Sequence, residues 1–267
     1  MNKIALLDTD FISKTYSVQD NCGNHLIDCI LKMPKYKFFC HAQIVIELNQ
    51  NCDESPLWLQ SNIASGKIKS YTDKAILESL TCIRGPYACA TYTQMLRMAC
   101  DAFSNNYFSE HYEALEDIDY ETVSNEDYLN RLQKLDLKVG KKNNLGEIKS
   151  FVLLQVLTFM FGEEIYVFCS DDKNARSGTV SIEKVRCISL LTAFSRLKKE
   201  MKWTIFDAEP YIESLIIFYE KSCQTTFKVI EASEVKRIKR VPCKQVLQEI
   251  FEGKFIELKN GMLRYKQ

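Results

Sequence analysis

The sequence predicts an α/β protein in which helices cover both faces of a central parallel β-sheet, a three-layer α/β/α sandwich. Two observations support this fold class. Apolar runs of strand length recur along the chain, and segments of helical periodicity lie between them. Strands that alternate with helices form parallel sheets, and their buried strands read as continuous apolar runs. With 267 residues, 46% of them hydrophobic and 26% charged, the chain can bury a sizeable core.

The N-terminal part shows this alternation clearly. Elements are predicted in the order strand, helix, strand, helix, strand and helix at residues 3–8, 25–33, 37–40, 42–50, 68–72 and 73–80. The first strand, KIALLD, is a continuous apolar run. Thr72 is a candidate N-cap for the last of these helices.

Residues 80–142 interrupt the alternation. The segment YACATYTQMLRMAC has a helical composition, and residues 113–127 carry seven acidic and no basic side chains. An acidic run of this kind is typical of a solvated helix face or loop. We interpret residues 80–142 as a mainly helical insertion.

The βα pattern resumes after the insertion. Asn143 or Asn144 can cap a helix at 145–161, and Ser189 can cap another. Strands are predicted at 163–170 and 185–189, helices at 190–201 and 203–219, and a final helix and hairpin with Asn260-Gly261 as its turn. The expected organisation is a domain over residues 1–202 and a small C-terminal extension over 203–267.

Charge and cysteine content exclude several classes of protein. The 35 basic residues match the 35 acidic ones, so no global charge draws the protein to nucleic acid or membrane, although local patches still can. The eleven cysteines include no CxxC pair, and we interpret them as reduced and mostly buried rather than as zinc ligands. The N-terminus lacks a signal-peptide pattern, and the longest apolar run, 151–161, is too short to span a bilayer. We therefore expect a cytoplasmic protein without a membrane partner.

Acidic residues follow or flank several predicted strands. Asp8 closes the first strand, Glu47 lies one turn into the helix after KFFC, Glu147 lies in the first turn of the helix at 145–161, and Asp171 and Asp172 follow YVFCS. Open α/β sheets bind ligands at the carboxyl ends of their strands. Acids gathered there would repel each other unless a divalent cation neutralised them, and oxygen-only ligands suit Mg²⁺ or Mn²⁺. For each acid alone a turn, capping or solvated role stays open.

Four short motifs together resemble the PIN-domain nuclease family. IALLDTDFIS is similar to its opening strand, FFCHAQIVIEL to its second motif, LGEIKSFVLLQ to its third and VFCSDDKNAR to its fourth. The resemblance covers about residues 1–200 without the insertion, and it departs from the family in the long gap between Glu47 and Glu147. It implies a PIN-like fold and a catalytic set of Asp8, Glu47, Glu147 and a last acid, with Asp172 as first choice and Asp171 as second.

The resemblance also implies the chemistry. The implied reaction is metal-assisted hydrolysis of phosphodiester bonds within an RNA strand. The resemblance implies that Asp8, Glu147 and Asp172 or Asp171 hold Mg²⁺ or Mn²⁺. The basic side chains beside the motifs can bind phosphates or only balance the acids; they are Lys149, Lys173 and Arg176. A C-terminal basic cluster is expected to bind the RNA backbone or a partner, or to be solvated; it consists of Lys236, Arg237, Lys239 and Arg240.

Other functions stay open at this point. Asp8-Thr-Asp10 also resembles the opening motif of haloacid-dehalogenase-like phosphatases, in which the first Asp is a nucleophile and the second an acid or base. In that family a Thr or Val is usual where Ile12 stands. A non-catalytic PIN-like RNA-binding or assembly subunit is a further alternative. The sequence also leaves open DNA as substrate, a homodimer, and a protein partner or inhibitor bound through the insertion or the extension.

Overall fold

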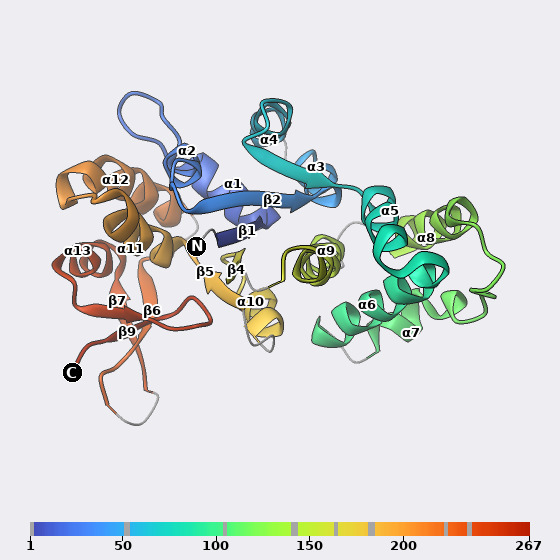
Figure 1. Ribbon diagram of the computed structural model, residues 1–267. Coiled ribbons are helices and arrows are strands. Elements are labelled where there is room, and N and C mark those ends of the chain that lie inside the picture. Colours follow the sequence, from blue (N-terminus) through green and yellow to red (C-terminus); the bar gives the residue numbers. More distant parts are fainter. Residues whose placement is uncertain are drawn as a thin grey trace. The chain divides into compact units, whose positions relative to one another are not determined.

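The computed structural model describes residues 3–50, 54–103, 106–139, 144–162, 165–180, 185–221, 224–233 and 237–267. The fold is α/β, with a central parallel sheet of five strands flanked by helices, as predicted (Figure 1). The strand order is β3-β2-β1-β4-β5. The strands are β1 (Lys3–Leu7), β2 (Tyr36–His41), β3 (Ile68–Tyr71), β4 (Ile165–Cys169) and β5 (Val185–Ile188).

The chain divides into two compact units. The first consists of Met1–Lys37 and Val167–Gln267, and the second of Phe38–Tyr166. The helices of the first unit are α1 (Thr9–Ser17), α2 (Leu26–Leu31), α10 (Lys173–Val180), α11 (Leu190–Met201), α12 (Ile205–Lys221) and α13 (Cys243–Glu252). Ser189 caps α11 in a capping box with Thr192, as its position before the helix predicts.

A second sheet forms the C-terminal part of the first unit. Its order is β7-β6-β9-β8, with β6 (Thr226–Ile230), β7 (Ile238–Pro242), β8 (Phe255–Glu257) and β9 (Leu263–Tyr265). β8 and β9 pair antiparallel, which confirms the predicted hairpin, and Gly261 in its turn has φ +74°. The antiparallel pair of β6 and β7 is not among the predicted elements. One side of this pair packs against α13 (Figure 1).

The second unit is largely helical between β3 and β4. Its helices are α3 (Ala42–Leu48), α4 (Ser55–Ala64), α5 (Asp73–Arg84), α6 (Ala88–Phe103), α7 (Tyr107–His111), α8 (Asn125–Val139) and α9 (Leu145–Phe161), with 3₁₀ turns η1 (Gly85–Tyr87) and η2 (Glu113–Leu115). Thr72 caps α5 by accepting from the backbone N–H of Ala75 at 3.2 Å, as predicted. All seven acidic residues of 113–127 are exposed, as expected of a solvated run.

The start of α9 differs from expectation. Asn144 occupies the N-cap position, but its φ is +54° and its side chain makes no capping hydrogen bond. Asn143, the other candidate cap, lies outside the described residues. The open N–H groups of this helix start must therefore find another partner.

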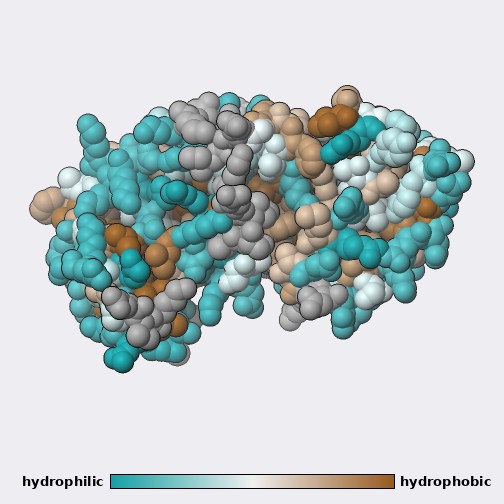
Figure 2. Space-filling view, turned by 60° about the horizontal axis from the view of Figure 1, so that its bottom comes forward, coloured by the Kyte–Doolittle hydropathy of each residue, from teal (hydrophilic) through white to brown (hydrophobic). Residues whose placement is uncertain are grey.

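The surface of the described residues carries apolar side chains in separate patches. Figure 2 shows hydrophilic residues over most of the visible face, with smaller hydrophobic areas among them. None of the helices in the described parts of the chain is long and apolar enough to cross a membrane.

Candidate functional site

Asp8 lies where two neighbouring strands of the first unit end together. Its backbone N–H donates to the carbonyl of Cys169, the last residue of β4, at 3.0 Å. The side chain of Asp8 is only 1% exposed. β1 and β4 therefore deliver their carboxyl ends to one place, with a buried carboxyl group there.

Asp10 joins the end of β1 to the end of β4. Its Oδ1 accepts from the Ser170 hydroxyl at 3.3 Å and from the backbone N–H of Asp171 at 3.1 Å. Lys14 lies one turn further along α1 and places its Nζ 2.8 Å from Asp171 Oδ2 and 3.4 Å from Asp10 Oδ2. We name Asp8, Asp10, Lys14 and Asp171 the strand-end cluster.

Electrostatics keep the Lys14–Asp171 pair of this cluster charged. Burial by itself would raise the pKa of Asp171, but attraction to Lys14 and hydrogen bonding hold that pKa below its ordinary value. Burial acts to lower the pKa of Lys14, and Asp171 and Asp10 reverse this and raise it. The nearby hydroxyl of Tyr219 has a raised pKa, through burial first and the charge of Asp171 second.

Asp172 has a different local role from Asp171. Its Oδ1 accepts from the backbone N–H groups of Asn174 at 2.5 Å and Ala175 at 3.0 Å, so it caps α10. The Asp172 side chain is exposed. The carboxylate of Asp171, the second choice from the sequence, is the one that lies in the strand-end cluster.

In the second unit, Glu47 takes over the capping that Asn144 does not provide. Its Oε1 accepts from the backbone N–H of Gly146 at 2.7 Å. A Cβ added to Gly146 would lie 2.7 Å from the Glu47 carboxyl carbon, closer than real contacts allow. Gly146 thus permits the carboxylate to reach the N-terminus of α9, where the helix dipole favours a negative charge.

Glu147 follows directly in the first turn of α9 and is half-buried. Tyr107 lies close enough to Glu47 and Glu147 to be affected by their charges. The pKa of its hydroxyl is raised by burial first, and the charges of Glu147 and Glu47 are among the further causes. The predicted second and third motifs are therefore close together in space.

Gly146→Ala is expected to destabilise the protein by about 1–3 kcal/mol, because the new methyl group displaces the Glu47 carboxylate. In an ordinary helical site the same change would stabilise by about 0.5–1 kcal/mol. Denaturant unfolding of Gly146→Ala, Glu47→Ala and the double variant measures this. The cost should disappear in the Glu47→Ala background, and an equal cost in both backgrounds would contradict the contact.

Lys149 belongs to a buried ion network in the second unit. Its side chain is 1% exposed, and its Nζ lies 3.2 Å from both Asp73 carboxylate oxygens and 2.9 Å from Asp136 Oδ2. His41 Nε2 lies 3.3 Å from Asp73 Oδ1, and the Tyr92 hydroxyl donates to the same oxygen. A phosphate can bind the Lys149 ammonium only if it replaces the contacts of Lys149 with Asp73 and Asp136.

The network is held charged by its own members. Burial would raise the pKa of Asp73, but Lys149 and then His41 lower it well below its ordinary value. Burial likewise would lower the pKa of Lys149, whereas Asp73 and Asp136 raise it. Neither Asp73 nor Asp136 is among the site residues predicted from the sequence. Asp73 directly follows the strand at 68–72, the same signal that identified Asp8, but Asp136 lies in an amphipathic helix and gives no local signal.

Most of the other predicted basic residues are exposed, but Arg176 is buried. Lys173 is exposed on α10, while Arg176 is 8% exposed and donates from Nη1 to the Ser170 carbonyl at 2.9 Å. Arg237, Lys239 and Arg240 of the C-terminal basic cluster are exposed, and Lys236 lies outside the described residues.

The predicted acids fall in both units: Asp8, Asp171 and Asp172 in the first, Glu47 and Glu147 in the second. Their convergence on one cleft stays a prediction. Among the residues that the structure describes, no group of three or more His, Cys, Asp or Glu side chains is placed to hold a metal ion.

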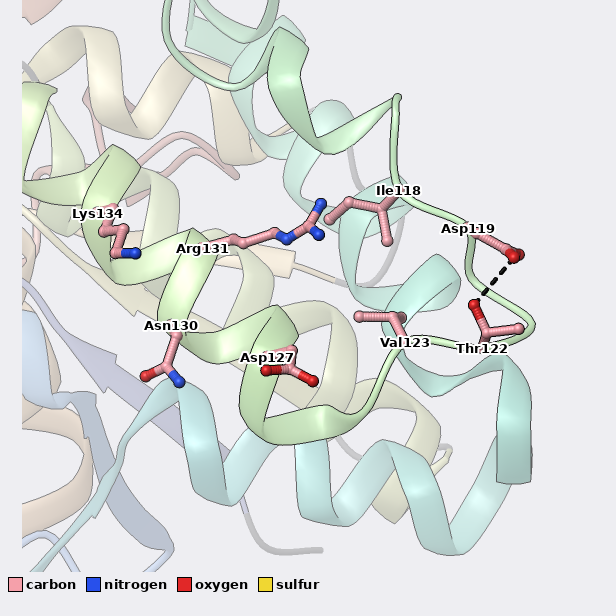
Figure 3. Close-up of a pocket in the computed structure, with 8 residues that line it drawn as sticks. All are labelled: Ile118, Asp119, Thr122, Val123, Asp127, Asn130, Arg131 and Lys134. Atoms are coloured by element: carbon pink, nitrogen blue, oxygen red, sulfur yellow. Dashed lines mark hydrogen bonds between the residues drawn. The ribbon is translucent and has the colours of Figure 1, made fainter.

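A small pocket of about 350 Å³ lies in the second unit, between α8 and the loop before it (Figure 3). Its cationic side chains are Arg131 and Lys134. Its acids serve local structure, since Asp119 accepts from the Thr122 hydroxyl at 2.9 Å and Asp127 from a serine hydroxyl. The pocket contains none of the predicted catalytic acids.

In comparisons with known proteins, no family model matches the chain, and no match is found among curated proteins or among solved structures.

Proposed function

We propose that the protein is a metal-dependent endoribonuclease with a PIN-like three-layer fold. One observation carries the proposal: Asp8 follows β1 where this strand ends beside β4, and there Asp10 accepts from the backbone N–H of Asp171. This is the edge at which α/β sheets bind ligands. Acids close to one another repel unless a cation neutralises them, and a divalent cation held there could in turn bind a phosphate.

The strand-end cluster has the donor chemistry that Mg²⁺ or Mn²⁺ requires. Its side-chain donors are carboxylate oxygens, with one hydroxyl from Ser170 beside them. The Lys14 ammonium lies between Asp10 and Asp171, so these two carboxylates already hold one cation. Asp8 and Asp171 would hold the ion, with Glu147 as the further ligand predicted from the sequence. Such an ion lowers the pKa of a bound water and stabilises charge on the attacked phosphate.

The chain's own groups prepare the site. Asp10 orients the end of β4 by accepting from Ser170 and from the Asp171 backbone. Lys14 holds the Asp171 carboxylate in place and keeps it ionised. Asp172 fixes the start of α10 through its capping bonds. These contacts position the acids before any substrate binds, which is what electrostatic catalysis needs.

The adjacent acids Asp171 and Asp172 provide a matched test. Asp171→Asn is expected to lower the rate of Mn²⁺-dependent RNA cleavage by about a hundredfold or more, because it removes a charged ligand. Asp172→Asn should retain the rate within about tenfold, because Asn also caps helices well. Labelled RNA and DNA oligomers with Mn²⁺ or EDTA serve as substrates. Equal losses in both variants would contradict the assignment of Asp171, and wild-type protein that cleaves no RNA in Mn²⁺ would contradict the function.

A further inference from the structure

A groove of about 760 Å³ lies in the first unit, beside the strand-end cluster. One wall comes from α1, α10 and the start of α11, and the other from the C-terminal sheet and the turn between β8 and β9. Its charged lining consists of Lys14, Asp171, Lys173, Arg176, Lys228 and Arg240. Five cations therefore face a single carboxylate.

Specific hydrogen bonds join the two walls. Arg176 donates from Nε to the Asn260 carbonyl at 3.0 Å and from Nη1 to the Ser170 carbonyl at 2.9 Å. The Ser189 hydroxyl donates to the Gly261 carbonyl at 2.7 Å. A Cβ added to Gly261 would lie 3.1 Å from the Ser189 nitrogen, so glycine permits this close approach. The C-terminal sheet is thus fixed to the ends of β4 and β5 and makes a permanent wall.

Three of the five cations are available to a ligand. Lys14 is engaged by Asp171, and Arg176 by backbone carbonyls. Lys173, Lys228 and Arg240 are exposed, and no ion pair engages them within the described part of the chain. The groove thus carries uncompensated positive charge next to the proposed catalytic acids.

Lys228 and Arg240 lie directly opposite each other in the antiparallel pair of β6 and β7. Like charges in this position destabilise a sheet. Residues alternate between the faces of a strand, so Ile230 and Ile238 share the face of these two cations. An anion bound over this face would relieve the repulsion.

Apolar side chains accompany the cations. Leu191, Ile230, Ile238 and Met262 also line the groove, and Ile238 is 57% exposed. Grooves for single-stranded nucleic acid combine cations for the phosphates with apolar or aromatic surface for unpaired bases. A duplex keeps its bases stacked inside and offers this surface mainly phosphates.

We infer that this groove binds the backbone and bases of single-stranded RNA and leads the strand to the strand-end cluster, with Lys173, Lys228 and Arg240 contacting phosphates. The inference rests on the proposed ribonuclease function and adds the form of the substrate and its path. It also divides the C-terminal basic cluster. Arg240 lines the groove, whereas Lys239 belongs to the opposite face, where its Nζ lies 5.9 Å from the centre of the Tyr265 ring.

Because Arg240 lines the groove and Lys239 does not, the C-terminal basic cluster provides a matched control. Binding of a fluorescent single-stranded RNA of about 12 nucleotides is measured by anisotropy with the full chain in EDTA, so that cleavage does not interfere. Salt is varied between about 50 and 200 mM, because each phosphate contact to a single strand contributes about 0.7 to the salt slope. Lys228→Ala with Arg240→Ala should reduce the slope by about 1.4 and weaken binding about 10–30-fold at about 0.1 M salt. Arg237→Ala with Lys239→Ala removes the same charge outside the groove and should change binding less than about threefold.

Three results would overturn the inference: equal losses in the two double variants, unchanged binding in the groove variant, or no binding of RNA by the wild type. Displacement of the RNA by a poly-glutamate peptide at equal charge concentration would instead identify an acidic protein as the occupant. Failure of the proposed function is distinguishable, because RNA would then bind in EDTA with the expected groove dependence but would not be cleaved in Mn²⁺.

Discussion

Lys149→Met is expected to lower the free energy of unfolding by about 3–5 kcal/mol, because it leaves two buried carboxylates without their cation. The Lys149 ammonium is within 3.2 Å of both Asp73 and Asp136 and is shielded from water. Denaturant unfolding measures the change. Lys138→Met, at an exposed site on α8, is the matched control and should change stability by no more than about 0.5 kcal/mol. A loss below about 1 kcal/mol in Lys149→Met would contradict the network.

The pH dependence of that loss has a defined sign. The pKa of Asp73 is depressed in the folded protein, so its contribution is present above the unfolded value of about 3.9 and is lost as the pH falls through the folded value. The pKa of Lys149 is raised, so its contribution is present below about 10.4 and is lost as the pH rises through the folded value. The difference between wild type and Lys149→Met should therefore be largest between about pH 5 and 9 and shrink in acid. A difference that grows below about pH 4 would contradict this assignment.

Asp8→Asn and Glu147→Gln are each expected to lower RNA cleavage by about three orders of magnitude or more, because each removes a charged ligand from the proposed metal site. Groups that act as one unit give strongly non-additive losses, so the double variant should be little slower than either single one. Thermal unfolding of each variant shows whether the fold persists, which matters for Asp8 because it is buried.

The same assay separates the nuclease from a phosphatase of the haloacid-dehalogenase type. In that alternative Asp8 forms a covalent aspartyl-phosphate, Asp10 protonates the leaving group and Glu147 is dispensable. Asp10 contacts Ser170 and the Asp171 backbone, so Asp10→Asn should affect the nuclease less than Asp8→Asn. Full activity of Glu147→Gln, with loss of phosphomonoester turnover in Asp10→Asn, would favour the phosphatase.

The strands of the central sheet were predictable where they are buried, because a run of apolar residues is visible in the sequence alone. KIALL of β1 and VRCI of β5 show this pattern, and Thr72 and Ser189 mark helix starts by local chemistry. β7 was not predictable in this way. Four of its five residues are exposed, two of them charged, so its strand character depends on pairing with β6.

In the candidate site, too, some residues could be predicted from their local sequence, whereas others depend on contacts between distant parts of the chain. Asp8 follows an apolar strand, and this position alone identifies it as a strand-end acid. The contact of Glu47 with Gly146 joins residues 99 positions apart, and no local pattern predicts that an acid on α3 caps α9. The choice between Asp171 and Asp172 likewise depends on Lys14 of α1, which only the fold brings to Asp171.

Single-turnover cleavage of a labelled RNA tests the central claim most directly. The substrate is mixed with wild type, Asp8→Asn, Glu147→Gln and the double variant, each in Mn²⁺ and in EDTA. We predict internal cuts by the wild type in Mn²⁺ alone, losses of about a thousandfold or more in both single variants, and a double variant little slower than either. Wild-type cleavage that persists in EDTA, or a Glu147→Gln variant with the full rate, would contradict a carboxylate-bound metal as the basis of catalysis.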